Sequence, residues 1–136
     1  MVVNKKLLEE LIEQARVSER KRHALLLHNS FKAPSQRLLN ALLPETVVPI
    51  HRHLSKEETY TILCGRINVC FFDDDGKAVK NIELSTQPSG NVLLVIPKGQ
   101  WHTVEVIEPS VIFEVSDGPY KPLIQEEYYN RNCKGF

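Results

Sequence analysis

HRHLSKEETYTILCG, residues 51–65, places two histidines two positions apart and a glutamate five positions beyond the second. Successive side chains of a strand point to opposite faces, so His51 and His53 share one face and both imidazoles can reach one ion. Glu58 can join them after a short turn. This stretch therefore predicts part of a metal site built on β-strands.

The chain from Thr46 onward consists of short segments that are rich in β-branched and aromatic residues and separated by turn signals. We expect Gly65 to separate two strands and the DDDG sequence at 73–76 to form a hairpin turn. Regularly spaced short strands without long helices between them indicate a β-sandwich or a small barrel. The expected strands cover residues 46–53, 58–64, 66–73, 78–84, 92–96, 102–107 and 110–116.

The N-terminal region has a different pattern. Apolar residues recur at helical spacing after Asn4, which predicts an amphipathic helix with Asn4 as its N-cap. We expect the apolar face of this helix to pack on the body of the protein or on a partner subunit. The run QRLLNALLP at 36–44 is compatible with a strand or a short helix, because periodicity does not separate the two in so short a run.

Composition indicates one soluble globular domain. Hydrophobic residues make up 42% and charged residues 25% of the 136 residues, as in ordinary folded proteins. The 17 basic and 17 acidic residues cancel, so there is no basic surplus to favour a nucleic acid or an anionic membrane as partner. No apolar run approaches the roughly 18 residues of a membrane span, and the start of the chain lacks signal-peptide features. We expect a cytoplasmic protein.

A second polar constellation lies in GNVLLVIPKGQWHTVEV, residues 90–106. Pro97 and Gly99 predict a turn that delivers His102 to the start of the next strand. If the strands close into a barrel, inward-facing residues of separate strands meet around one cavity. His102 would then complete a site with three nitrogen ligands and one oxygen ligand.

These residues resemble the cupins, whose two motifs read G(X)5HXH(X)3-4E(X)6G and G(X)5PXG(X)2H(X)3N. The first motif is matched by His51, His53, Glu58 and Gly65, and the second by Pro97, Gly99 and His102. Glu58 is preferred to Glu57 because only Glu58 has the six-residue spacing to Gly65. The sequence departs from the motifs at three positions. Glu45 stands in place of the opening glycine of the first motif, Val106 stands in place of the final asparagine of the second, and Gly90 lies one position early. All four ligands match.

The resemblance implies an all-β cupin fold, a small β-barrel or jelly roll, with an N-terminal α-helix. It divides the single domain 1–136 into a helix and extension (1–45), a metal-binding barrel (46–116) and a C-terminal tail (117–136). It also implies one divalent transition metal held by His51, His53, Glu58 and His102. Imidazole and carboxylate ligands together suit Fe, Mn, Ni, Co or Zn, and an octahedral ion would keep two positions open for substrate or O₂.

The chain also resembles the WbuC family of cupin-fold metalloproteins over nearly its whole length. The resemblance rests on HNSFKAPSQRLLNALLP (28–44), FDDDG (72–76), PKGQWHT (97–103) and FEVSDGPYKP (113–122). It implies a link to bacterial O-antigen and other surface-polysaccharide biosynthesis, without a settled reaction. One departure is Leu26, where that family tends to carry an asparagine.

Further candidate residues surround the expected metal. Tyr60 shares the strand face of Glu58, so it is a candidate substrate-binding residue. Four polar side chains of the N-terminal segment are candidates to reach over the mouth of the site. They could bind a carboxylate, a phosphate or a sugar hydroxyl there, and they are Arg22, His28, Gln36 and Arg37. The alternative for each is a surface hydrogen bond or salt bridge.

Glu114 interrupts an otherwise apolar strand. A buried glutamate needs a proton or a partner, so it is either a catalytic acid/base or one half of a buried pair with Arg22 or Arg37. His28 is a second candidate for proton transfer.

Two classes of function follow. The first is an enzyme acting on a small polar or sugar-derived molecule, by isomerisation or epimerisation, or as a dioxygenase if the metal is Fe(II). The second is a non-catalytic binding or regulatory module. The helix face and the tail YYNRNCKGF, residues 128–136, predict a homodimer, because apolar faces and free sheet edges invite partners.

Overall fold

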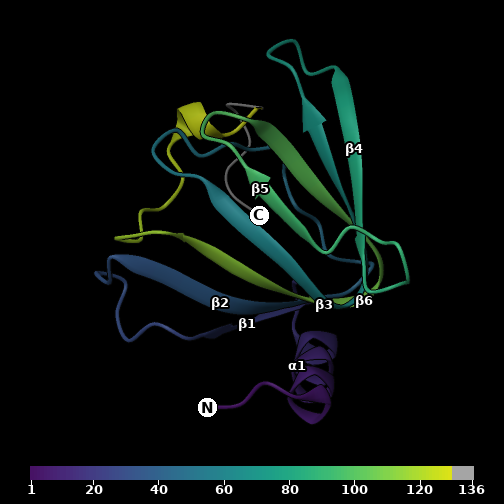
Figure 1. Cartoon of the computed structure of the whole chain (residues 1–136). Coiled ribbons are helices and arrows are strands. Elements are labelled where there is room, and N and C mark those ends of the chain that lie inside the picture. The colour runs from purple at the N-terminus through teal and green to yellow at the C-terminus, as the bar shows by residue number, and fades with distance from the viewer. Residues whose placement is uncertain (130–136) are drawn as a thin grey trace.

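The computed structural model describes residues 1–129. Figure 1 shows one helix set against a bent antiparallel sheet. The elements are α1 (Lys5–Val17), β1 (Arg22–Leu26), β2 (Ser35–Leu42), β3 (Glu58–Phe72), β4 (Ala78–Ser85), β5 (Leu93–Ile96), β6 (Trp101–Asp117) and the 3-10 helix η1 (Gln125–Glu127). Cys133 and most of the tail that was predicted to join a dimer contact lie outside the described residues.

The strands form a single sheet in the order β1-β2-β6-β3-β4, with β5 paired to the first part of β3. All these pairings are antiparallel. The predicted all-β fold with an N-terminal helix is therefore confirmed. The sheet does not close, however, so the expected barrel is an open, folded sheet, with β1 and β4 at the ends of the strand order.

A short connection forces β3 to fold back on itself. Ile96 of β5 pairs with Glu58 at the start of β3, whereas Trp101 of β6 pairs with Phe72 at its end. A straight strand of 15 residues would hold those ends roughly 45 Å apart. The four residues between Ile96 and Trp101 can span only about 18 Å, so β3 must bend.

Gly65 provides the bend. It has a φ of +86° and lies where the pairing of β3 with β6 shifts register, as in a β-bulge. A Cβ at this position would also overlap the Ser110 hydroxyl and the Pro109 carbonyl oxygen. The prediction that Gly65 ends a strand is thus wrong, because the bulge turns β3 without breaking it. The segments predicted at 102–107 and 110–116 likewise form one strand, β6.

The N-terminal extension contributes to the sheet. The run 36–44, which was compatible with a strand or a short helix, forms most of the strand β2. This strand pairs with both β1 and β6. The strand predicted at 46–53 is wrong, since this segment is a loop with one isolated bridge residue, His51. Pro49 in its middle has no N–H to donate to a ladder.

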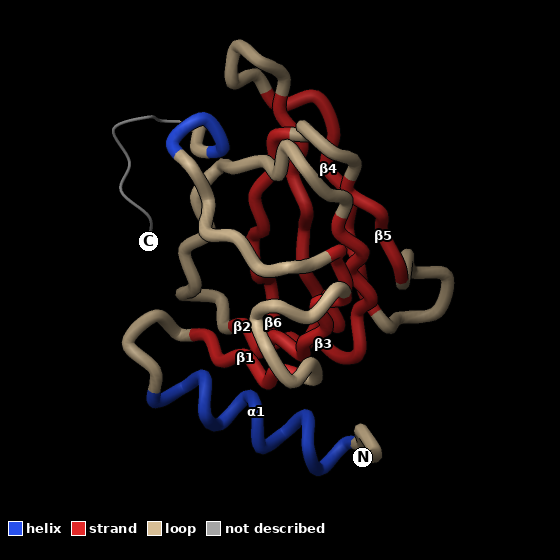
Figure 2. Tube along the Cα trace, turned by 90° about the vertical axis from the view of Figure 1, so that its left-hand side faces the viewer, coloured by secondary structure: helices blue, strands red, loops and turns tan. Residues whose placement is uncertain are grey.

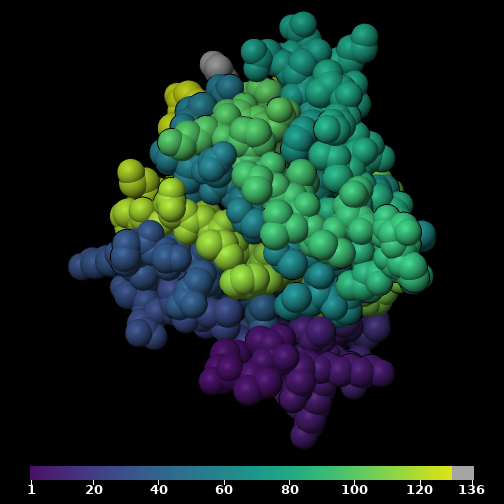
Figure 3. All heavy atoms as spheres, in the orientation of Figure 1, coloured from purple at the N-terminus to yellow at the C-terminus, as the bar shows by residue number. Residues whose placement is uncertain are grey.

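Two cores lie on the two faces of the bent sheet. The first fills the inside of the bend, where Tyr60 and Ile62 from one half of β3 meet Ile67 and Val69 from the other. The second lies under α1 and contains Leu11, Ala15, Leu39, Ala41, Leu43 and Val111. Figure 2 shows α1 running along the outside of the sheet, and Figure 3 shows it as a ridge at one end of the molecule.

The start and packing of α1 agree with the prediction. Asn4 is the N-cap, and its side-chain oxygen accepts a hydrogen bond from the Leu7 N–H at 3.0 Å. Leu11 and Ala15, four residues apart, are the buried positions of the helix, as expected for an amphipathic helix on a sheet. The apolar face is covered by the body of the same chain.

We expect Gly65→Ala to lower the free energy of unfolding by more than about 2 kcal/mol, because positive φ and overlap with backbone atoms act together. Gly99→Ala is the matched control, since Gly99 has a similar φ of +77° but open space where the Cβ would lie. It should lose only about 1 kcal/mol. Urea denaturation measures both, and equal losses would show that crowding at Gly65 is unimportant.

Candidate metal centre

Four side chains converge at the inner end of the bend. His51, His53, Glu58 and His102 each offer one ligand atom, and these atoms all lie within 4.8 Å of one another. Glu57 is exposed. The structure therefore brings together the four residues that the motif spacing selected, as a group able to hold a metal ion.

Backbone hydrogen bonds hold the loop of His51 and His53 against β6. His51 and His102 exchange reciprocal N–H to carbonyl bonds of 3.0 and 2.9 Å, and the Gly99 N–H donates to the His53 carbonyl oxygen at 2.8 Å. The predicted turn at Pro97 and Gly99 thus places His102 and also anchors His53. Ligands from two distant segments share one rigid frame.

Hydrogen bonds also set the tautomers of two histidines. His51 Nδ1 lies 2.8 Å from the Pro49 carbonyl oxygen, and His102 Nδ1 lies 2.9 Å from the Gln100 carbonyl oxygen. A carbonyl oxygen only accepts, so each Nδ1 carries the proton and each Nε2 keeps a lone pair. Metal-binding histidines usually donate such a hydrogen bond from the ring nitrogen that does not bind the metal.

The inner nitrogen of His102 lacks a suitable protein partner. Its side chain is fully buried, and Nε2 makes no hydrogen bond with any residue between 1 and 129. It lies 3.5 Å from Glu58 Oε1, which is also 3.0 Å from His53 Nε2. Because the lone pair of His102 Nε2 faces a carboxylate oxygen, a cation between them would relieve the repulsion. The donor set therefore fits a divalent transition ion.

The environment favours the protonation states that a ligand needs. Burial, together with the neighbouring His102, lowers the pKa of His51 to about 4. Burial would by itself raise the pKa of Glu58, but the neighbouring His102 and His53 imidazoles hold that pKa well below its usual range. At neutral pH, His51 is neutral and Glu58 is ionised, so neither must lose a proton to bind a metal.

The cluster opens into a cavity of about 210 Å³. Its other polar lining residues are Arg22, Asn40, Tyr60 and Glu114, and its apolar lining residues are Leu42, Val48, Val104 and Ile112. The Tyr60 hydroxyl donates a long hydrogen bond to Glu58 Oε1, at 3.4 Å. Arg22, Tyr60 and Glu114, three of the residues singled out from the sequence, thus lie around the candidate metal centre.

Glu114 is the second carboxyl group of this cavity. Burial and the negative charge of Glu58 raise its pKa to about 7. Its Oε1 accepts a hydrogen bond from Asn40 Nδ2 at 3.1 Å. Glu114 therefore can both hold and release a proton near neutral pH. Asn40 was missed, although a polar residue inside the apolar run RLLNALL could have marked it.

The other three N-terminal candidates lie outside this cavity lining. The Gln36 amide donates to the Ala33 carbonyl oxygen at 3.0 Å, and His28 Nδ1 accepts from the Arg37 N–H at 3.0 Å. Arg37 is exposed. It lies two residues from Leu39 on β2, so it shares the strand face of Leu39, which packs under α1. These contacts hold the connection between β1 and β2, and Arg37 faces away from Glu114.

Comparison with known proteins identifies the family. Residues 3–84 match the family described as Domain of unknown function (DUF6016). The chain belongs to the DUF6016 family. A comparison with curated proteins gives no match. Within residues 1–129, no helix is long and apolar enough to cross a membrane.

Solved structures show that this DUF6016 protein has the fold of cupin-domain proteins. It is similar to a cupin-2 domain protein from Shewanella frigidimarina, with a TM-score of 0.59 and 18% identity over 86% of this chain and 95% of that chain. For a cupin superfamily protein from Desulfitobacterium hafniense, the TM-score is 0.57 and the identity 17%, over 74% of this chain and 81% of that chain. For the protein TT1209 from Thermus thermophilus, the TM-score is 0.59 and the identity 22%, over 86% of this chain and 97% of that chain. At these identities the likeness extends to the fold alone.

We expect the protein to bind one equivalent of a divalent transition metal, and His102→Ala to weaken binding by at least about 100-fold, because a buried ligand is lost. His23→Ala, which alters a histidine of β1 outside the cluster, is the control and should bind as the wild type does. Elemental analysis after desalting and a competition titration measure occupancy and affinity. Full occupancy in His102→Ala would contradict the assignment.

The metal-free protein should lose stability in acid partly through His51. Its folded-state pKa is lowered from 6.5 to about 4, so between these values the unfolded chain takes up a proton that the folded protein refuses. Stability therefore falls as pH decreases through this window, by up to about 3 kcal/mol from this residue. Urea titrations at pH 7, 5.5 and 4 measure the unfolding free energy of the wild type and of His51→Gln. The value for the wild type minus the value for His51→Gln should become smaller as the pH is lowered. A constant difference would contradict the lowered pKa.

Proposed function

We propose that this protein is a metal-dependent enzyme that isomerises or epimerises a small polar or sugar-derived molecule. The proposal rests on one observation, that three members of the four-residue cluster, His51, His53 and Glu58, line the same cavity as the proton-holding Glu114. When bound there, a divalent ion would supply Lewis-acid polarisation of a carbonyl or hydroxyl oxygen. His51, His53, Glu58 and His102 would hold it.

Glu114 is placed to move a proton within the cavity. Glu58 pairs with Ser116 across the β3–β6 ladder, and Glu114 lies two residues from Ser116 on the same face. The Cα atoms of diagonal neighbours of this kind are about 7–8 Å apart, and the cavity of about 210 Å³ that both glutamate side chains line has room for one small molecule. Asn40 occupies Oε1, so Oε2 remains to take a proton from a carbon next to a carbonyl and to return it.

Other residues of the cavity select what enters. Arg22 presents a cation and Tyr60 a hydroxyl, both suited to a polar molecule with oxygen substituents. The apolar side chains of Leu42, Val104 and Ile112 limit water around the reacting atoms. The resemblance to the WbuC family supports a substrate from bacterial surface-polysaccharide metabolism, including O-antigen synthesis. His28 has no role in this proposal, because it does not line the cavity.

Hydrogen exchange tests the proposed reaction. With metal-loaded protein in D₂O, we expect NMR to show deuterium entering a keto sugar or related carbonyl compound beside the carbonyl carbon. Glu114→Gln should slow this exchange by at least about 100-fold, a typical loss for a missing acid/base, and should keep its metal. Glu105→Gln, which alters an exposed glutamate of the same strand, should exchange at the wild-type rate.

The same screen separates the alternatives. Metal retention without exchange or O₂ uptake across the compounds would replace the enzyme with a binding or regulatory module. Consumption of O₂ by iron-loaded protein, with no deuterium incorporation, would replace isomerisation with an Fe(II)-dependent dioxygenase reaction. Wild-type exchange in Glu114→Gln would remove Glu114 from the mechanism.

A further inference from the structure

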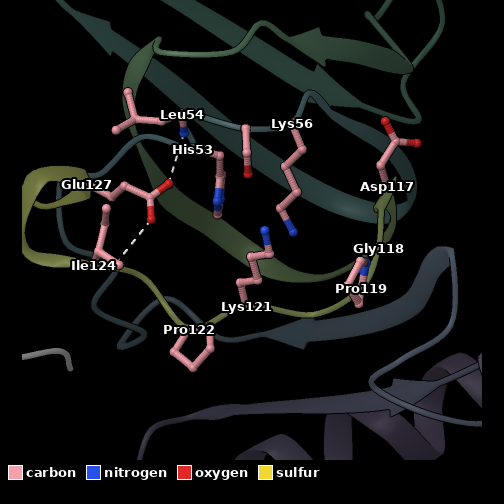
Figure 4. A pocket seen from close by; sticks show the side chains of 11 residues that line it. His53, Leu54, Lys56, Asp117, Gly118, Pro119, Lys121, Pro122, Ile124 and Glu127 are labelled. Atoms are coloured by element: carbon pink, nitrogen blue, oxygen red, sulfur yellow. Dashed lines mark hydrogen bonds between the residues drawn. The ribbon is translucent and has the colours of Figure 1, made fainter.

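A second cavity, of about 310 Å³, adjoins the metal centre on the side of His53. Figure 4 shows Lys56 and Lys121 reaching into it from different segments, with their ends turned toward one another and the His53 ring beside them. Lys56 lies in the loop between His53 and Glu58, and Lys121 follows the end of β6. This cavity thus joins a metal-ligating histidine to two cationic side chains.

Neither ammonium group forms a salt bridge with a carboxylate of residues 1–129, although the charge of Lys56 also acts on the buried Glu114. Lys56 Nζ donates to the neutral Ser116 hydroxyl at 3.0 Å. The Asp117 carboxylate, at the rim, points away from the lysine ends in Figure 4. Two like charges turned toward one another repel unless an anion lies between them.

The remaining carboxylate of the cavity is already engaged. Glu127 accepts hydrogen bonds from the Leu54 N–H at 2.9 Å and from the Ile124 N–H at 3.1 Å, shown as dashed lines in Figure 4. It therefore closes the wall of the cavity and does not neutralise the lysines. The lining holds two lysines and two carboxylates, but Glu127 is bound to backbone N–H groups and Asp117 points away, so positive charge gathers only where the two lysine ends meet.

The pattern of charge suits phosphate better than carboxylate. A phosphate monoester carries nearly two negative charges at neutral pH, which matches two ammonium groups. Lysine binds phosphate as a point charge, whereas a planar carboxylate is best matched by the fork of an arginine. Lys56 is already held in place by Ser116, so part of its conformational freedom is lost before a ligand binds.

We propose that Lys56 and Lys121 form a phosphate-binding subsite, and that the substrate is a phosphorylated small molecule. Its phosphate lies between the two ammonium groups, and the rest of the molecule extends past His53 toward the metal centre and Glu114. The role of this subsite in turnover rests on the proposed function. Phosphate binding itself needs neither the reaction nor Glu114.

Titration with inorganic phosphate tests the subsite on the full-length protein. Calorimetry at pH 7.5, with chloride holding the ionic strength at about 0.15 M to screen surface charge, should show phosphate binding more tightly than acetate. Lys56→Gln and Lys121→Gln should each weaken phosphate binding at least tenfold, since each removes one charge-assisted contact. Lys80→Gln, which alters an exposed lysine of β4, should bind as the wild type does.

Matched measurements make each outcome decisive. Lys121 is exposed, so Lys121→Gln should keep the wild-type melting temperature and metal content. Wild-type phosphate affinity in both lysine variants, or acetate binding as tight as phosphate binding, would overturn the subsite. Loss of phosphate binding in His102→Ala but not in the lysine variants would overturn it too, because phosphate would then be a metal ligand. Phosphate binding that needs the lysines, without hydrogen exchange on any compound, would keep the subsite and reject the proposed reaction.

Discussion

The bend of β3 at Gly65 is the constraint on which the rest of the molecule depends. The short connection from β5 to β6 requires the two ends of β3 to lie close together, and Gly65 can adopt the conformation that allows it. Glu58 and His102 belong to opposite ends of one ladder, yet their ligand atoms are 3.5 Å apart. The inner core, the metal cluster and its cavity all lie inside this one bend.

The cavity holds two carboxyl groups with opposite proton preferences. Glu58 stays ionised because imidazoles surround it, whereas Glu114 holds its proton up to about pH 7 because it is buried beside that negative charge. Environments that separate the pKa values of neighbouring acids are typical of sites where one group binds charge and the other transfers protons. In this chain both carboxyl groups come from the same pair of strands, β3 and β6.

The function proposed here depends on residues of this chain more than on its fold. Cupin neighbours at 17% to 22% identity establish the architecture, but one architecture supports many chemistries. Arg22 lines one cavity beside the cluster and two lysines line another, although the protein is neutral overall. This distribution of charge is the basis for expecting an anionic, oxygen-rich substrate.

Local spacing in the chain was sufficient to predict the helix at its N-terminus and most of the strands, and together with the resemblance to the cupin motifs it selected all four candidate ligands. Alternation along a strand, the turn at Pro97 and Gly99, and the distance from Glu58 to Gly65 are all short-range properties. Tertiary contacts decided what lies far apart in sequence. They made Ser35–Leu42 a strand between β1 and β6, gave Glu114 the partner Asn40 and turned Arg37 to the other face. They also brought Lys121 to Lys56, which no local pattern could indicate, because the fold of the whole sheet sets the distance between them.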